Sequence, residues 1–263
     1  MKGHLTFLGR LSLLSLLVAA VVPAARALVI YGGSSGHTTN PGDGLPWDNV
    51  GTGGVYLGAF DTGYWVITAN HVGSGGITLG GTFYSSVSGS VQQIGTTDLL
   101  LYRIDASTNG APALANLNFS SSTPVPGGDV VMIGNGGGVK TWGTNEVDQY
   151  ANYSLAANGP QTAGLITTYS PITGEAQGQG GDSGGGLFFQ MLDGSWILSG
   201  ILSGIGTSNG TEFTASVAVA FYYTQIAALV GNAITPVPEP ATWTLLAGGA
   251  ALVGAGFIRR RKA

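Results

Sequence analysis

The 263-residue sequence contains no cysteine. This absence excludes disulfide bonds and thiolate metal sites, so the folded chain depends on its apolar core and its hydrogen bonds. Basic residues are also scarce between residues 28 and 235. Arg103 and Lys140 stand there against twelve acidic residues, which gives this segment a net charge of about −10. Because such a charge repels nucleic acid and anionic membranes, we expect no nucleic-acid partner.

Long helical patterns are missing from residues 28 to 235 as well. The apolar stretches there are short, and Gly, Ser, Thr, Asn and Pro separate them. Strands are predicted at residues 54–60, 64–69, 98–104, 129–134, 185–189, 195–205 and 215–223. One short helix is predicted near residues 222–232, where a Gly-Asn pair ends it. The pattern indicates a single all-β domain, built as a barrel or a sandwich.

The amino end has the features of a secretory signal peptide. Lys2 and Arg10 precede the apolar run 11–22, and Ala25 and Ala27 place small residues ahead of a cleavage site. We therefore predict that residues 1–27 form a signal peptide, that signal peptidase cuts after Ala27, and that the protein is exported.

The carboxyl end has three parts in a fixed order. Residues 235–242 hold three prolines that prevent helix, the uncharged run 241–258 is just long enough to cross a bilayer, and RRRK follows. This tail, with the triplet PEP at residues 238–240, resembles the PEP-CTERM sorting signal of Gram-negative bacteria. The resemblance implies that residues 236–263 form a transient transmembrane anchor, which an exosortase removes, and that the protein reaches the cell surface or the medium. An ordinary tail anchor is the alternative.

The stretch GDSGGG, residues 181–186, places Ser183 in an unusually bare backbone. A serine hydroxyl becomes a good nucleophile when a neighbouring base takes its proton, and histidine is the usual base at neutral pH. Of the three histidines, His4 lies in the predicted signal peptide and His37 lies in a loop without an apolar framework. His71 ends the strand pattern YWVITANHV and is therefore the candidate base.

The same stretch also fits G-x-S-x-G, the nucleophile elbow of α/β-hydrolases. In that fold the histidine follows the serine along the chain. No histidine follows Ser183, and the helices that would alternate with strands are missing. These two observations exclude the elbow.

The order His71, Asp98, Ser183 resembles that of chymotrypsin-like serine proteases. VITANHV is similar to the histidine motif of the family, with Asn70 where alanine is usual and Val72 where cysteine is usual. TDLLLYRI is similar to its aspartate motif, and GDSGGG matches its serine motif except that a glycine replaces the common last proline. LSGILSGIG resembles the strand that lines the substrate cleft, and FYYTQIAAL resembles the closing helix. The similarity covers about residues 55–230.

The resemblance implies an all-β fold, a two-lobed chymotrypsin-like double β-barrel with a short C-terminal helix. It implies that Ser183 is the nucleophile, that His71 is the general base and that Asp98 orients the imidazole. The backbone N–H groups of Gly181 and Ser183 would hold the oxyanion. Asp105 closes the same strand and is the alternative acid, but the family places its acid before the apolar run. The resemblance implies no cofactor and no metal.

Two residues are expected to contact the substrate side chain. The resemblance places Gln177, six residues before Ser183, at the base of the primary pocket and Ser203 in the strand along the cleft. Since Gln177 is uncharged, a preference for Arg or Lys would lack its counter-charge. Glu175 is only two residues earlier and would reverse that statement, so the preferred side chain stays open.

The function that the resemblance implies is that of a secreted serine endopeptidase, a monomer with a polypeptide substrate. Two alternatives use the same fold. One is a non-catalytic cell-surface or matrix binding module, which would not require a complete triad. The other is an esterase, because ester hydrolysis is the easier acyl transfer and uses the same three residues.

Cleavage after Ala27 also predicts a mechanism of activation. The resembling animal enzymes become active when a new apolar amino terminus folds inward and its ammonium pairs with the aspartate beside the catalytic serine, here Asp182. The mature chain would begin LVIYGG, and Arg103 and Lys140 are the only other cations in the domain. We therefore predict that the Leu28 ammonium pairs with Asp182.

Overall fold

The computed structural model describes residues 27–119 and 121–231. The first 26 residues of the predicted signal peptide and the whole predicted sorting tail, with its transmembrane segment, lie outside these residues. Among the residues described, no helix has the length and apolarity that crossing a membrane needs.

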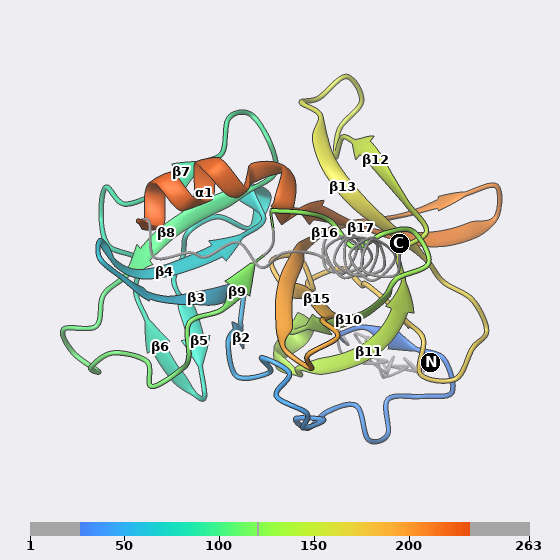
Figure 1. The fold of residues 1–263 in the computed structure, drawn as a ribbon, viewed down its shortest axis with the longest axis horizontal. Coiled ribbons are helices and arrows are strands. Elements are labelled where there is room, and N and C mark those ends of the chain that lie inside the picture. Colours follow the sequence, from blue (N-terminus) through green and yellow to red (C-terminus); the bar gives the residue numbers. More distant parts are fainter. Residues whose placement is uncertain (1–26, 120, 232–263) are drawn as a thin grey trace, which may run out of the picture.

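The described residues form two lobes of β-structure (Figure 1). The amino-terminal lobe holds β2 (Val50–Gly51), β3 (Gly54–Phe60), β4 (Gly63–Thr68), η1 (Asn70–Val72), β5 (Ile77–Leu79), β6 (Thr82–Tyr84), β7 (Gln92–Gln93) and β8 (Leu100–Ile104). The carboxyl-terminal lobe holds β1 (Val29–Ile30), β9 (Asn118–Phe119), β10 (Asp129–Gly134), η2 (Gly136–Gly138), β11 (Thr141–Glu146), β12 (Gln149–Tyr153), β13 (Thr162–Thr168), β14 (Ala176–Gln177), β15 (Gly186–Gln190), β16 (Trp196–Ser208) and β17 (Thr211–Ala218). The chain then runs through η3 (Val219–Tyr222) into α1 (Tyr223–Val230).

The amino-terminal lobe is built on one antiparallel sheet with the strand order β2-β3-β4-β8-β7. Successive side chains of a strand point to opposite faces, and here both faces are buried. Tyr56, Val66 and Tyr102 pack against the β5–β6 hairpin, whereas Leu57 and Ile67 face the larger core that the two lobes share. This double burial explains why the strand segments of this lobe are almost continuously apolar.

The carboxyl-terminal lobe contains one sheet with the order β11-β10-β15-β16-β17-β13-β12, and β9 pairs in parallel with β16. The two-lobed, all-β, chymotrypsin-like arrangement is confirmed, but the strand ladders stay open, because β11 and β12 at the two ends of the sheet share no ladder. The Asn145 side chain bridges part of this gap. Its Nδ2 donates to the carbonyl oxygens of Thr168, at 3.1 Å, and Ala176, at 2.8 Å.

Every predicted strand and the predicted helix are present, although β16 runs three residues past its predicted end and β17 begins four residues before its predicted start. Strands β3 and β10 have the predicted bounds, and α1 lies inside the predicted helical segment. The prediction for residues 215–223 was wrong at its end, because β17 stops at Ala218 and the next four residues form η3. The chain leaves the sheet there in order to cross to the other lobe.

The final helix joins the two lobes. Figure 1 shows α1 lying across the amino-terminal lobe, although it follows the last strand of the carboxyl-terminal lobe. Ile226 and Val230 are fully buried in the shared core with Trp65. Burying side chains of this size stabilises the contact by about 1.5–3 kcal/mol each. Thr62 Oγ1 also donates to the Leu229 carbonyl at 3.2 Å.

Candidate active site

His71 and Asp98 lie at the same edge of the amino-terminal sheet. Strand β4 ends at Thr68 and η1 then carries His71, while Asp98 lies two residues before β8. Because β4 and β8 are antiparallel and Thr68 lies opposite Leu100, the end of one strand coincides with the start of the other. The Asn70 N–H donates to the Asp98 carbonyl at 3.2 Å and ties the two segments together.

The His71 ring and the Asp98 carboxylate are in direct contact. His71 Nδ1 lies 2.9 Å from Asp98 Oδ2 and 3.0 Å from Oδ1, and the His71 backbone N–H donates to Oδ1 at 2.9 Å. The hydrogen bond with Asp98 raises the pKa of His71 above its ordinary value, against an opposing effect of burial. With Nδ1 held by the carboxylate, the neutral ring presents the lone pair of Nε2 to the cleft.

Asp98 is also held by two residues of the other lobe. Its backbone N–H donates to Thr162 Oγ1 at 2.9 Å, and Ser203 Oγ donates to its Oδ2 at 2.5 Å. Burial alone would raise the pKa of Asp98, but the hydrogen bonds from His71 and Ser203 outweigh it and hold the pKa below its usual value. Asp98 is therefore ionised at neutral pH and spans the junction between the lobes.

Asp105, the alternative acid, lies at the opposite end of β8. Its carboxylate is exposed and accepts a hydrogen bond from the Ser107 N–H at 2.8 Å. That local turn accounts for its lowered pKa. Of the two aspartates, only Asp98 contacts His71.

The glycines around Ser183 allow two features that side chains would prevent. Gly181 has φ +102° and Gly184 has φ +87°, in the left-handed region that favours glycine. A Cβ on Gly184 would also lie 2.6 Å from Thr68 Oγ1. The serine loop therefore packs directly on the strand end that leads to His71.

Ser203 connects the two halves of the site. Its side chain contacts Asp98, and its carbonyl accepts a hydrogen bond from Ser183 Oγ at 3.3 Å. Within the described part of the chain, no hydrogen bond joins Ser183 to His71. The serine hydroxyl is thus turned toward the β16 backbone in this state.

The Asp182 carboxylate points away from the cleft into the protein. It is 2% exposed and accepts three backbone hydrogen bonds, from Leu28 at 2.9 Å, Gly136 at 2.9 Å and Gln179 at 2.8 Å. Burial raises its pKa to about 6, although these bonds act in the opposite direction. Leu28 is the residue that the sequence led us to expect beside Asp182, and with Ala27 still attached its nitrogen makes this contact as a neutral peptide N–H.

Two backbone donors next to Ser183 remain available. In the described residues, neither the Gly181 N–H nor the Ser183 N–H donates a hydrogen bond to a protein acceptor. The serine loop is anchored by the Asp182 carboxylate, which accepts hydrogen bonds from the Gly136 and Gln179 N–H groups. Both N–H groups of Gly181 and Ser183 therefore have no protein acceptor and lie close to the serine hydroxyl along the chain.

Comparison with known protein families agrees with this geometry. The profile of the trypsin-like peptidase domain matches residues 51–197, more than half of the chain. The chain belongs to the trypsin-like peptidase family. The match contains His71, Asp98 and Ser183. No curated protein sequence is similar enough to this peptidase to count as a match.

Solved structures of proteases are similar to this trypsin-like peptidase at low sequence identity. The active form of the Rv3671c protease from M. tuberculosis is 20% identical, with 70% of this chain and 75% of that chain covered and a TM-score of 0.50. The HtrA-type protease AlgW, solved with a decapeptide, is 21% identical over 66% of this chain and 50% of that one, at a TM-score of 0.45. The Murine Norovirus NS6 protease, in an inactive mutant form, is 17% identical over 66% and 93%, at a TM-score of 0.46.

A second family profile covers the tail of the peptidase. The PEP-CTERM protein-sorting motif matches residues 236–262. This match confirms the resemblance of the tail and indicates export to the cell envelope of a Gram-negative bacterium.

A small pocket opens beside Ser183. Its lining includes Ser203, which was expected to contact the substrate, together with Ile205 and Thr214, which sequence reasoning missed. Gln177, expected at the base, is not among the lining residues. It is buried in β14, where it pairs with Val29 of β1. The amino-terminal segment therefore occupies the edge of the strand that carries Gln177.

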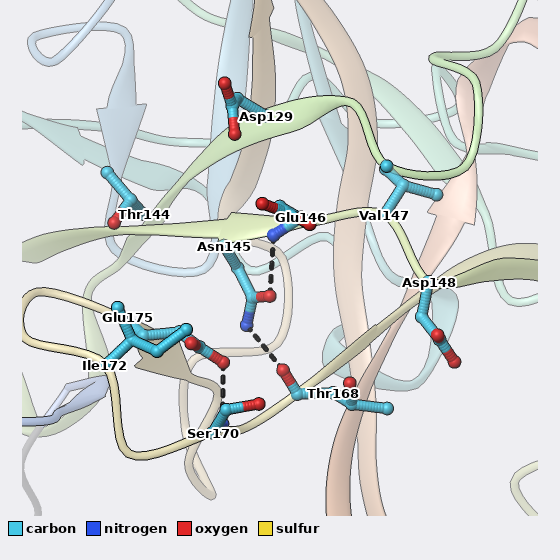
Figure 2. Close-up of a pocket in the computed structure, with 11 residues that line it drawn as sticks. Asp129, Thr144, Asn145, Glu146, Val147, Asp148, Thr168, Ser170, Ile172 and Glu175 are labelled. Atoms are coloured by element: carbon cyan, nitrogen blue, oxygen red, sulfur yellow. Dashed lines mark hydrogen bonds between the residues drawn. The ribbon is translucent and has the colours of Figure 1, made fainter.

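A larger cavity of about 440 Å³ lies elsewhere, between β11, the end of β13 and the loop before β14 (Figure 2). It contains Glu175, the alternative pocket residue, whose Oε1 accepts a hydrogen bond from the Ser170 N–H at 2.6 Å. Ser183 does not line this cavity. Figure 2 shows Asp129, Glu146 and Asp148 around the same hollow. Among the described residues, no three acidic or histidine side chains are placed to hold a metal ion.

Proposed function

We propose that this peptidase is an exported serine endopeptidase that hydrolyses peptide bonds through Ser183, His71 and Asp98. The observation that carries the proposal is the contact between His71 Nδ1 and the Asp98 carboxylate at the junction where the Ser183 loop packs against the strand end. A binding module would not need an ionised aspartate buried between the lobes to orient a half-exposed histidine.

The reaction would follow the acyl-enzyme route. Ser183 Oγ attacks the peptide carbonyl while His71 Nε2 takes its proton, and Asp98 stabilises the imidazolium. The N–H groups of Gly181 and Ser183 hold the negative oxygen, and one such donor is worth about 3–4 kcal/mol. The imidazolium then gives its proton to the leaving amine. Water, activated by the same histidine, releases the acyl group from Ser183.

One rearrangement must precede the attack. Ser183 Oγ donates to the Ser203 carbonyl, so it has to rotate about its Cα–Cβ bond to reach His71 Nε2. Bonds between nucleophile and base are often loose without substrate and tighten when substrate is bound. A substrate N–H that takes over the Ser203 carbonyl would release the hydroxyl, which couples substrate binding to formation of the reactive pair.

The free edge of β16 suits an extended substrate. Strand β15 pairs with β16 as far as Ile201, whereas β17 continues on the other side to Ser208. From Ser203 onward, one edge of β16 therefore has no partner strand in the described residues. An extended peptide can add to such an edge through backbone hydrogen bonds.

A fluorophosphonate probe tests the proposed chemistry. We expect covalent labelling of Ser183, identified by peptide mass spectrometry, together with cleavage of unfolded protein such as reduced casein. Labelling with ester hydrolysis but no peptide cleavage would favour the esterase. Correctly folded protein that neither reacts nor cleaves would favour the binding module.

Asp98→Asn should lower kcat about 10⁴-fold, because the amide no longer holds the reactive tautomer of His71. The pH profile carries a second signature. Activity needs neutral His71, and the hydrogen bond with Asp98 raises the pKa of that histidine, so activity of the parent should fall as pH drops through this raised pKa. In Asp98→Asn the acid limb should move to lower pH. An unmoved acid limb in kcat/KM would contradict the assignment of Asp98.

We also propose that residues 1–27 are removed as a signal peptide, that residues 28–235 form the mature peptidase domain, and that residues 236–263 act as a sorting tail with a transmembrane segment. The PEP-CTERM match supports the last boundary. Signal peptidase and an exosortase would be the processing partners, and the mature domain would act as a monomer. The mass of the exported protein, measured by mass spectrometry, shows where the chain is cut at each end.

A further inference from the structure

The pocket beside Ser183 is small and carries no available charge. Its volume is about 60 Å³, and Gly178, Leu202, Ser203, Ile205 and Thr214 contribute to its lining. Asp182 is the single acidic residue among the lining residues. Its carboxylate already accepts hydrogen bonds from three backbone N–H groups of the protein, so it does not supply a charge for the substrate.

Two side chains restrict the pocket. Ile205 and Thr214 are direct partners in the β16–β17 ladder, so their side chains lie next to each other on one face. A Cβ on Gly178, in the opposite wall, would lie 3.1 Å from Thr214 Cγ2 and 3.3 Å from Ile205 Cγ2. The two walls of the pocket are therefore in close contact at the Ile205 and Thr214 side chains. A hydrogen bond of 2.9 Å from the Gly178 N–H to Thr214 Oγ1 holds them together.

We infer that this pocket selects substrates with a small, uncharged side chain on the residue whose carbonyl is attacked, such as alanine or valine, and that Ile205 sets this limit. The inference rests on the proposed function of Ser183. An aromatic ring would have to displace the Ile205 and Thr214 side chains.

A cationic side chain would find no counter-charge in the pocket, since the Glu175 carboxylate faces a different cavity. A buried charge without a partner is strongly disfavoured. An acidic side chain would meet the same penalty, and it would also approach the overall negative charge of the domain.

The test uses the purified enzyme and a set of peptides that differ only at the residue whose carbonyl is attacked. This residue is Ala, Val, Phe, Arg or Asp. For the parent enzyme, we expect kcat/KM for Ala or Val to exceed that for Phe, Arg and Asp by about tenfold or more, because a few misfitting heavy atoms in such a pocket produce discrimination of this size. Ile205→Gly should raise kcat/KM for Phe by about tenfold or more and should leave the Ala substrate equal or poorer.

Thr207→Gly is the matched control. Thr207 is two residues further along the same strand, is exposed, and lies outside the pocket lining. The Thr207→Gly substitution introduces the same backbone freedom into β16 without changing the pocket. It should therefore leave the ratio of kcat/KM for the Phe substrate to that for the Ala substrate unchanged. Ile205→Ala, which keeps a Cβ, should move the ratio in the same direction as Ile205→Gly by a smaller factor.

Fluorophosphonate labelling of each variant separates failure of this inference from failure of the proposed function. If the parent is labelled at Ser183 and prefers Arg, Asp or Phe, the inference is overturned and the proposed function stands. The same holds if Ile205→Gly is labelled normally and shifts the ratio no more than Thr207→Gly does. If the folded parent is neither labelled nor active, both are overturned.

Discussion

Replacing Ser183 or His71 by alanine should reduce kcat/KM for a cleaved peptide on the order of 10⁵-fold or more. The two residues act as one unit, because the hydroxyl is a poor nucleophile without a base and the base has no proton to take without the hydroxyl. The double variant should therefore fall no further than either single variant. Initial rates with a fluorogenic peptide, together with circular dichroism of each variant, measure the effect at constant fold.

Two matched substitutions control for nonspecific damage. His37→Ala removes the other histidine of the described residues, which contacts Trp142 through a 2.9 Å bond to its carbonyl. Ser88→Ala removes an exposed serine of the amino-terminal lobe. Both should retain near-parental kcat/KM. Near-parental turnover by folded Ser183→Ala would refute the proposed nucleophile.

Apolar patterning predicted the three long strands of the amino-terminal lobe, β3, β4 and β8, and missed its short strands β2, β5, β6 and β7 and part of the other lobe. Strand β3 is apolar on both faces because both faces are buried, so its sequence stands out. Strands β11 and β12 read TWGTNE and QYANY, and most of their side chains are polar or partly exposed. Their pairing with β10 and β13 depends on tertiary contacts that a single sequence does not reveal.

Some residues of the candidate site could be predicted from the sequence and others could not. His71, Asp98 and Ser183 lie in motifs with characteristic neighbours, so the sequence alone pointed to them. Thr162 lies in β13 and contacts Asp98 only because the lobes meet there, and no local pattern signals it. Counting back from the serine suggested Gln177 for the pocket, but β1 pairs with the strand that carries it, and Ile205 and Thr214 line the pocket instead.

The structure places Leu28 where the predicted activation needs it. Its backbone nitrogen lies 2.9 Å from Asp182 Oδ2, and Leu28 is 2% exposed. The two cations of the domain are engaged elsewhere. Lys140 Nζ donates to the Trp47 and Val50 carbonyls, and Arg103 donates to the Thr62 carbonyl. An ammonium at Leu28 would thus be the charged partner that the buried Asp182 lacks.

Enzyme that begins at Leu28 should be about tenfold or more active than enzyme with Gly-Ser added ahead of Leu28. The extension turns the ammonium into a neutral N–H, which keeps a hydrogen bond to Asp182 but no longer carries the charge that pairs with the carboxylate. A buried charge that loses its charged partner is strongly disfavoured. Because Asp182 anchors the loop that carries Gly181, the proposed oxyanion donor, a weakened anchor should lower kcat more than it raises KM. Mass spectrometry of the exported protein verifies the natural amino terminus.

The pH dependence of the two forms should differ in a defined direction. In the extended form, burial holds the pKa of Asp182 at about 6, so the folded state favours the protonated acid and stability should fall as pH rises from about 4 to 6. In the form that begins at Leu28, carboxylate and ammonium stabilise each other. This contribution is lost at acid pH when the carboxylate is protonated, and at alkaline pH as pH rises through the raised pKa of the amine, above about 8. Asp182→Asn should remove the difference between the forms. Equal kcat and equal thermal stability of the two forms from pH 5 to pH 9 would rule out the pairing, because a neutral N–H cannot reproduce the charge of the ammonium.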